Sequence, residues 1–330
     1  MKKFLRLLPL AATALAAVVA LAPVKSAFAL DKLTVAHSIW VGYGPLYIAR
    51  DKGYFKDEGL EVDLKVMDDT KLRMGALLAG QIDAAATSVD VALPFMTPTH
   101  QIRYLFALDD SRGGDGIVAK KSIPDVAGLK GKKVGFLQGS PSELLLAAAL
   151  KKAGIGLKDI DAVHMGAGDA GAAFLSGKID AAVTWEPWLS RGKSAPDGHL
   201  LMDSTATPGL ITDVLVATAK ESKAKQKDFQ GFYRAWVKAV DFAKAHPAEA
   251  NAIMAKGVGG WLKDPKAFAD ALSGVSLYGA AENKAYIGTA AAPGSITEVI
   301  QEAADLRAEG GDMRMKVVPA KTIDYSVVNP

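Results

Sequence analysis

The chain contains no cysteine. This absence excludes disulfide bonds, thiolate-ligated zinc or iron–sulfur sites, a cysteine nucleophile and a lipid anchor on an N-terminal cysteine. An excess of charge of one sign is also missing, because 39 basic and 36 acidic residues leave a formal net charge of only +3. A balance this even gives no indication of nucleic-acid binding, so we expect no nucleic-acid partner.

What remains is an ordinary globular composition in a long chain. Of the 330 residues, 50% are hydrophobic and 23% are charged, which excludes a disordered, collagen-like or coiled-coil chain. A chain of this length is longer than the chains that usually fold around a single hydrophobic core. We therefore expect more than one folded lobe.

Residues 1–29 have the pattern of a cleavable export signal. A basic start is followed by an uncharged, alanine-rich run from Leu7 to Leu21 and by Ala-Phe-Ala at positions 27–29. The run is shorter than the roughly 20 apolar residues that a membrane-spanning helix needs. Cleavage after Ala29 would remove four cations and no acid, so the formal net charge of +3 would become −1.

An internal repeat predicts two lobes of the same plan. Positions 80–87 (Gly-Gln-Ile-Asp-Ala-Ala-Ala-Thr) and 177–184 (Gly-Lys-Ile-Asp-Ala-Ala-Val-Thr) are identical at six of eight places. Each segment follows an apolar helical stretch, so each is expected to be a strand buried in a parallel sheet. Further predicted strands recur at a similar offset: 62–67 with 160–165, 33–37 with 133–137, and 115–118 with 213–216. This alternation predicts an α/β fold with mostly parallel sheets.

The last of these pairs predicts a hinge. If each half ends at its Asp-x-apolar-Val segment, the chain crosses between the lobes twice, near Asp115 and near Asp213. We expect lobe 1 to comprise residues 30–115 and 215–330, and lobe 2 to comprise residues 116–214. Two Rossmann-like lobes would then surround a central cleft. The mainly helical tail after residue 220 carries aromatic residues at helical spacing, which are expected to be core.

Candidate ligand-binding residues follow from the strand ends. Ligands of open parallel sheets bind beyond the carboxyl ends of the strands, often at helix N-termini. For the serines the alternative is helix capping alone, and for the tryptophans it is core packing. The residues that the two lobes place at such ends are Ser38, Trp40, Tyr43, Thr87, Ser88, Asp90, Asp109, Ser140, Ser142, Trp185, Glu186 and Asp213.

No motif indicates a catalytic residue, a cofactor or a metal. The run Gly166-Ala-Gly-Asp-Ala-Gly171 matches G-x-G-x-x-G, but the helix after it would be short and no ribose-binding acid follows at the required place. The five histidines share no ligand or catalytic spacing, and no G-x-S-x-G or H-E-x-x-H motif occurs. We expect a binding protein, not an enzyme.

Residues 38–62, S-I-W-V-G-Y-G-P-L-Y-I-A-R-D-K-G-Y-F-K-D-E-G-L-E-V, resemble the opening of solute-binding proteins of nitrate/sulfonate/taurine-type ABC importers. Further matching runs extend this resemblance from about residue 33 to residue 216. It implies a monomeric periplasmic protein with a type II-like two-lobe fold. Such a protein delivers a small molecule to membrane permease subunits that work with a cytoplasmic ATPase. Thiamine-precursor synthases share this fold, but they use a cysteine-containing motif that this chain lacks.

The ligand is open to two interpretations. The best-known ligands of the resembling family are sulfonates, taurine and nitrate, which suit a helix N-terminus such as the one predicted at Ser140. The other strand ends, however, carry several acids and only one nearby cation, Arg112. Acids beside Trp40 and Trp185 favour a cationic or neutral nitrogenous solute, such as a urea- or guanidine-like compound. We expect Asp90 and Glu186 to face each other across the cleft.

Overall fold

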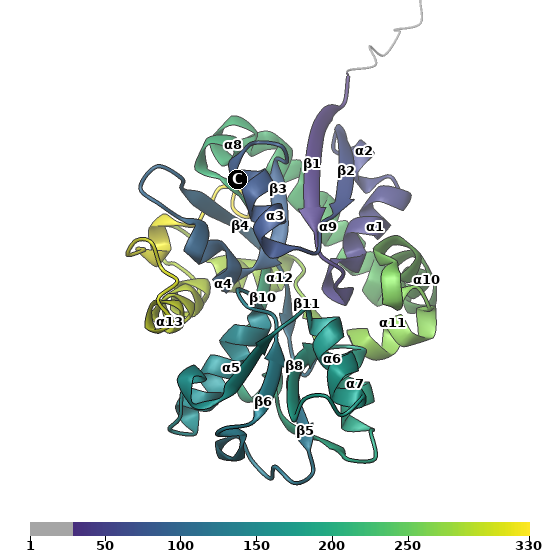
Figure 1. Ribbon diagram of the computed structural model, residues 1–330. Coiled ribbons are helices and arrows are strands. Elements are labelled where there is room, and N and C mark those ends of the chain that lie inside the picture. Colours follow the sequence, from purple (N-terminus) through teal and green to yellow (C-terminus); the bar gives the residue numbers. More distant parts are fainter. Residues whose placement is uncertain (1–28) are drawn as a thin grey trace, which may run out of the picture.

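The computed structural model describes residues 29–330 (Figure 1). Residues 1–28 of the predicted export signal lie outside this range. Within residues 29–330, none of the helices combines the length and the apolar character that crossing a membrane requires.

The first sheet has six strands in the order β11-β4-β10-β3-β1-β2. Strand β1 pairs in parallel with β2 and β3, as expected, whereas β10 runs antiparallel to both β3 and β4. The parallel prediction thus holds for the three N-terminal strands but not for the strands at the other edge. The strands of this sheet are β1 (Asp31–His37), β2 (Leu60–Val66), β3 (Ala84–Ser88), β4 (Ile102–Ser111), β10 (Thr212–Thr218) and β11 (Val275–Leu277).

The second sheet repeats this plan with five strands in the order β7-β6-β8-β5-β9. Strand β6 pairs in parallel with β7 and β8, and β5 is antiparallel to β8 and β9. The repeated sequence therefore forms equivalent strands, β3 and β8. The strands of this sheet are β5 (Asp115–Lys120), β6 (Lys133–Phe136), β7 (Asp161–His164), β8 (Ala181–Trp185) and β9 (Gly198–Asp203).

The two sheets exchange a strand. Strand β5 directly follows β4 in sequence but lies in the second sheet, and β10 follows β9 but lies in the first sheet. The chain consequently passes between the sheets at residues 112–114 and again at residues 204–211. We call the first sheet with the helices that cover it lobe 1, and the second sheet with its helices lobe 2 (Figure 1).

Helices α1 to α4 belong to lobe 1, and α5 to α7 belong to lobe 2. Helices α9 and α10 return to pack on α1, whereas α13 packs against α4 of lobe 1 and α5 of lobe 2. Helix α13 thus lies beside the gap between the lobes (Figure 1). The helix bounds are α1 (Gly44–Asp51), α2 (Tyr54–Asp57), α3 (Thr70–Leu78), α4 (Val89–Ala92), α5 (Pro141–Lys152), α6 (Ala167–Leu175), α7 (Trp188–Lys193), α8 (Ala219–Ala224), α9 (Gln226–Ala245), α10 (Pro247–Val258), α11 (Pro265–Leu272), α12 (Ala280–Ile287) and α13 (Ile296–Glu309).

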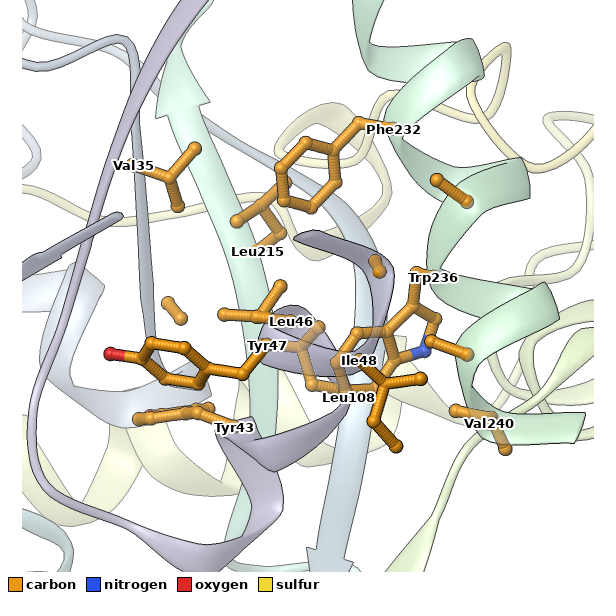
Figure 2. Packing of buried hydrophobic residues seen from close by; sticks show 14 of the residues in the cluster. Val35, Tyr43, Leu46, Tyr47, Ile48, Leu108, Leu215, Phe232, Trp236 and Val240 are labelled. Atoms are coloured by element: carbon orange, nitrogen blue, oxygen red, sulfur yellow. The ribbon is translucent and has the colours of Figure 1, made fainter. Parts of the chain in front are cut away.

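The core of lobe 1 explains why the helical tail returns. In α9, Phe229, Phe232 and Trp236 recur at helical spacing, and all three are fully buried against the sheet (Figure 2). Phe106 of β4 meets Phe232 and Trp236 there, with both pairs of ring centroids 6.2 Å apart. Their burial confirms the expectation that these aromatic residues form core. Burying a large apolar side chain of this kind stabilises the folded state by about 1.5–3 kcal/mol.

Candidate ligand-binding site between the lobes

A cavity of about 590 Å³ lies between the two lobes. Eight of the predicted ligand-binding residues line it, and they come from both lobes. Those from lobe 1 and its returning strand β10 are Ser38, Trp40, Tyr43, Thr87, Ser88 and Asp213, and those from lobe 2 are Ser140 and Trp185.

Aromatic rings supply one part of the wall. Trp40 follows β1, and its indole Nε1 donates a 3.0 Å hydrogen bond to Oδ1 of Asp109 on β4. The next turn depends on Gly42, because a Cβ there would lie 2.0 Å from Oδ2 of Asp109. Trp185 ends β8 of lobe 2 and packs against the lobe 1 apolar cluster that contains Trp40. Trp40 and Trp185 therefore line one cavity from opposite lobes.

Two buried carboxylates line the cavity where the chain changes lobe. Asp115 begins β5 and pairs with Trp185 in the sheet register, and Asp213 in β10 pairs with Ser88. Burial raises the pKa of Asp115 to about 7, although a hydrogen bond from Ser111 opposes the shift. Burial likewise raises the pKa of Asp213 to about 7, opposed by a hydrogen bond from Tyr43. Both carboxyl groups thus lack the compensation that would hold them ionised.

A third carboxyl group lies directly behind these two. Asp109 is 1% exposed, and burial together with the neighbouring charge of Asp213 raises its pKa well above the usual range. Its Oδ2 has no hydrogen-bond partner among residues 29–330. Asp110, by contrast, pairs with Arg112 at 2.9 Å. The interior between the lobes therefore has an acidic centre formed by Asp109, Asp115 and Asp213.

Two cations, Lys71 and Arg73 of α3, line the same cavity. Arg73 of α3 is 3% exposed, and its guanidinium donates to the main-chain oxygen of Met67. Its Nε has no partner within the described part of the chain. We did not expect this residue, because it lies inside a helix and not at a strand end. Arg73 therefore places a positive charge in the cavity wall, close enough to Asp213 that it opposes the rise in the pKa of that carboxyl group.

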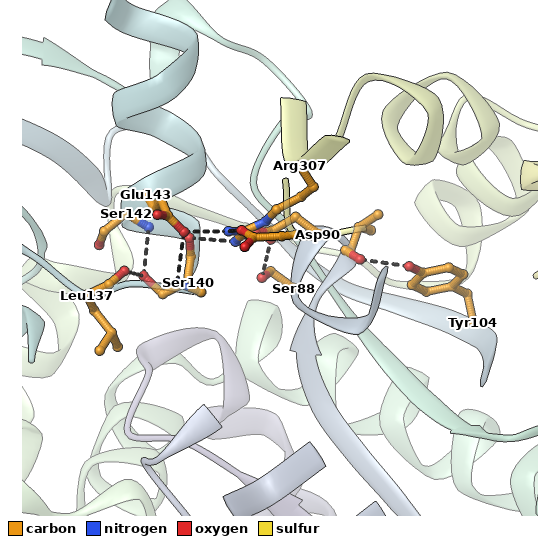
Figure 3. A network of polar contacts seen from close by, with 11 residues as sticks. Ser88, Asp90, Tyr104, Leu137, Ser140, Ser142, Glu143 and Arg307 are labelled. Atoms are coloured by element: carbon orange, nitrogen blue, oxygen red, sulfur yellow. Dashed lines mark hydrogen bonds and ion pairs between the residues drawn. The ribbon is translucent and has the colours of Figure 1, made fainter. Parts of the chain in front are cut away.

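Helix N-termini provide polar groups from each lobe. Ser140 caps α5, since its Oγ accepts from the main-chain nitrogen of Ser142 at 3.2 Å and donates to Leu137 at 2.7 Å (Figure 3). Ser88 precedes α4, but its hydroxyl donates to Oδ1 of Asp90 at 2.6 Å and makes no capping bond. Thr87 is 1% exposed, and its Oγ1 has no partner in residues 29–330. Thr87 therefore lines the cavity with a hydroxyl group that has no partner among these residues.

Four predicted site residues do not line the cavity, which corrects the sequence-based expectation. Asp90 is fully buried in an ion pair with Arg307, at 2.5 Å. Glu186 turns to α7, where its carboxylate accepts from the hydroxyl of Ser190 at 2.7 Å. Ser142 is buried in the first turn of α5, and Asp109 lies behind Trp40. The expected face-to-face pair of Asp90 and Glu186 is therefore wrong, because each carboxylate already has an internal partner.

Several lining residues escaped the sequence reasoning. Trp261 comes from the C-terminal region, which has no counterpart in the repeat, whereas in lobe 2 Gln138 follows β6 and His164 is the last residue of β7. Asp115 marked the hinge in the sequence but was not assigned to the site. The signal that could have found it is its equivalence to Asp213 in the repeat.

No metal centre is built into this region. Among residues 29–330, no group of three or more histidine or acidic side chains has an arrangement that could hold a metal ion.

Comparisons with known proteins agree with this geometry. Residues 40–250 match the family model described as "NMT1/THI5 like". A protein of Brucella abortus named as a binding protein is 29% identical over 212 residues, which cover 63% of this chain and 66% of the relative. A Bacillus subtilis protein named for binding aliphatic sulfonates is 26% identical over 212 residues, 62% of this chain and 64% of its own length. The chain thus spans just under two thirds of these relatives.

The chain is also similar to an enzyme in sequence and to a solved binding protein in fold. The 4-amino-5-hydroxymethyl-2-methylpyrimidine phosphate synthase of Aspergillus parasiticus is 27% identical over 223 residues, which cover 63% of this chain and 65% of that enzyme. The periplasmic aliphatic sulphonate binding protein SsuA of Escherichia coli superposes with a TM-score of 0.73 at 20% identity, over 91% of this chain and 99% of that one.

The fold is that of the periplasmic binding proteins. More particularly, the chain belongs to the NMT1/THI5-like family.

Proposed function

We propose that this protein is the periplasmic solute-binding component of an ABC importer. A small molecule would enter the cavity between the lobes, contact both, and be released unchanged to permease subunits that a cytoplasmic ATPase serves. The observation that carries this proposal is a polar, aromatic-lined cavity whose walls come from two lobes connected by exchanged strands. Binding would favour the closed form to the extent that the ligand contacts that form better. The protein would act as a monomer.

The two lobes would move about the segments where the chain crosses. The sequence-based bounds are residues 30–115 and 215–330 for the first moving unit and residues 116–214 for the second; because β10 begins at Thr212 in the first sheet and β5 begins at Asp115 in the second, we propose that residues 212–214 move with the first unit and Asp115 with the second. Asp115 and Asp213 begin or enter the exchanged strands, so the acidic centre lies on the expected bending region. A ligand bound there would contact both units at their junction.

The favoured ligand is an organic cation or a neutral solute rich in N–H donors, in the urea- or guanidine-like class. Asp115 and Asp213, not the expected Asp90 and Glu186, carry this inference, because both line the cavity and both are buried. Bringing an anion beside two buried carboxylates would cost free energy, whereas N–H donors would satisfy them. The rings of Trp40 and Trp185 add surfaces that suit a planar cation.

The alternative ligand is a sulfonate, taurine or nitrate. The N-terminus of α5 at Ser140 and the guanidinium of Arg73 both line the cavity, and each suits an anion. The Bacillus subtilis relative is named for such a ligand. In this case Asp115 and Asp213 would be protonated and therefore neutral, which their raised pKa values allow.

A pyrimidine-synthase activity is the competing class, because one relative carries that name. The cysteine-containing motif of that branch is missing from this chain, which contains no cysteine at all. Recovery of unchanged ligand after binding would separate the two classes, since an enzyme would return a product.

A thermal-unfolding screen of the mature protein tests the proposal. The compounds are guanidinium, methylguanidine, urea, taurine, methanesulfonate and nitrate, each at millimolar concentration, with sodium chloride at equal ionic strength as the control. A ligand at 100 times its dissociation constant stabilises the folded state by about 2.7 kcal/mol. Stabilisation by taurine or methanesulfonate and by none of the nitrogenous compounds would establish the anion alternative. Stabilisation by none of the six would overturn the proposed ligand classes.

A further inference from the structure

Arg307 joins the two lobes although it lies outside the cavity. It belongs to α13 and is 3% exposed (Figure 3). Its Nη2 donates to Oδ2 of Asp90 in lobe 1 at 2.5 Å, and its Nη1 donates to Oε2 of Glu143 in lobe 2 at 2.6 Å. A third hydrogen bond runs from Nη2 to the main-chain oxygen of Ser140 at 3.0 Å. One guanidinium thus binds α4 and the start of α5 at the same time.

Each partner of Arg307 is itself bonded to a loop of the cavity wall. The second oxygen of Asp90 accepts from the hydroxyl of Ser88, at 2.6 Å. Glu143 accepts from the main-chain nitrogen of Gly139, at 2.9 Å, which fixes the turn before Ser140. Ser88 and Ser140 both line the cavity. A chain of bonds therefore runs from the lobe 1 wall through Arg307 to the lobe 2 wall.

We propose that Arg307 is a positioning residue that fixes the separation of Ser88 and Ser140 and thereby holds the lobes in their present arrangement. This inference rests on the proposed function for its biological meaning, but the geometry that it concerns exists without any ligand. It assigns to the C-terminal helix the task of setting how far the cleft opens.

The geometry explains why arginine is suited to this place. Its planar fork presents several N–H groups in fixed directions, so one side chain can bind two carboxylates and a carbonyl together. Because α13 packs on both α4 and α5, rotation of lobe 2 about the crossing segments would move Glu143 away from Asp90. Arg307 could then follow only one of them. Opening would therefore break bonds on one side of the guanidinium.

The absence of cysteine makes a direct measurement simple. We would replace Lys56 of lobe 1 and Lys178 of lobe 2, both exposed, by cysteine and attach a spin label to each. The distance between the labels is measured by double electron–electron resonance in the ligand-free mature protein. The measurement is made on the otherwise unchanged chain and on Arg307→Gln, Arg307→Lys and Glu143→Gln.

The matched control is an ion pair between the same two helices. Lys151 of α5 and Glu309 of α13 lie 2.6 Å apart, but both side chains are more than half exposed (59% and 58%). Lys151→Gln removes a surface pair that bonds to no wall of the cavity. We expect it to leave the distance between the labels unchanged.

Arg307→Gln is expected to shift the distance distribution to longer values and to broaden it. Arg307→Lys, which keeps the charge but cannot bind both carboxylates as a fork, should give an intermediate shift. Glu143→Gln keeps the size of the side chain and tests the lobe 2 bond alone if Arg307→Gln does not fold. A distribution equal to that of the parent in both Arg307→Gln and Glu143→Gln would overturn the proposal. Because no ligand is added, this result does not depend on the solute screen.

Discussion

The indole nitrogen of Trp40 and the Oδ1 of Asp109 lie 3.0 Å apart in a hydrogen bond that joins the loop after β1 to β4. This bond holds the ring of Trp40 against the cavity and keeps the Asp109 carboxyl behind it. A residue expected to bind ligand is thus a support for another residue that lines the cavity.

Replacement of Gly42 by alanine should destabilise the protein and weaken ligand binding. The new methyl group would lie 2.0 Å from Oδ2 of Asp109 and 2.6 Å from the indole nitrogen of Trp40, so both side chains must move. Overpacking of this kind costs about 1–3 kcal/mol. Chemical denaturation measures the loss. Gly75→Ala is the control, because Gly75 is exposed in α3 with open space around it and alanine should stabilise the helix by about 0.5–1 kcal/mol. Equal effects of the two changes would contradict the packing argument.

Trp185→Ala should lower ligand affinity at least tenfold. The ring lines the cavity from lobe 2, and burial of an aromatic side chain is worth about 1.5–3 kcal/mol. Isothermal titration calorimetry with the compound found in the solute screen gives the affinity. Trp188→Ala serves as the control, since that ring packs on Gly168 and Gly171 of α6 and beneath Arg191 and does not itself line the cavity. Unchanged affinity in Trp185→Ala would show that the ring is only core.

The ligand-free protein should lose stability as the pH rises from about 4 to 7. Burial raises the folded-state pKa of Asp115 to about 7, above the value of about 3.9 in an unfolded chain. The folded state therefore holds a proton that the unfolded state releases, and stability falls with pH by up to about 1.4 kcal/mol per unit for this group. Urea denaturation at pH 5 and pH 8 should show a smaller difference for Asp115→Asn than for the parent.

The control for this pH effect is Asp180→Asn. Hydrogen bonding from Lys120 lowers the pKa of Asp180, so its contribution to stability is lost only on acidification below about pH 4. The Asp180→Asn change should therefore leave the difference in the free energy of unfolding between pH 5 and pH 8 the same as in the parent. A parent protein equally stable at pH 5 and pH 8, with Asp115→Asn behaving identically, would show that Asp115 is ionised without cost.

Asp213→Asn should separate the two ligand classes. A cationic ligand needs the carboxylate, so its affinity should fall at least tenfold in the variant, and in the parent it should increase between pH 5 and pH 8. An anionic ligand should show the reverse, with tighter binding in the variant and at low pH. Isothermal titration calorimetry of the parent and of Asp213→Asn at both pH values measures these affinities and distinguishes the two ligand classes. Identical affinities in parent and variant would place Asp213 outside the binding contacts.

The exported protein should begin at Leu30. The basic start, the alanine-rich run and Ala-Phe-Ala at positions 27–29 predict cleavage there. Intact-mass measurement of protein released from the periplasm of an expressing host tests this directly. A full-length mass in the membrane fraction would contradict the predicted signal.

The repeated plan of the molecule could be predicted from the amino-acid sequence. Two nearly identical strand segments indicated two similar sheets, and they form the equivalent strands β3 and β8. Strand ends and helix starts were also predictable, because burial, glycine and capping residues follow the local periodicity of the chain. Trp40, Tyr43, Ser88, Ser140 and Trp185 were found in this way, and all five line the cavity.

Which acids face the cavity could not be predicted from the sequence, because it depends on contacts between distant helices and strands. Asp90 follows a predicted strand and Asp213 begins one, yet Arg307, 217 residues beyond Asp90 in the chain, binds Asp90 in a buried ion pair. Arg73 and Trp261 reach the cavity from a helix interior and from the C-terminal region, where no repeat signals them. The physical reason is that periodicity fixes the face of an element, whereas the partner of a buried charge depends on which distant helix packs beside it.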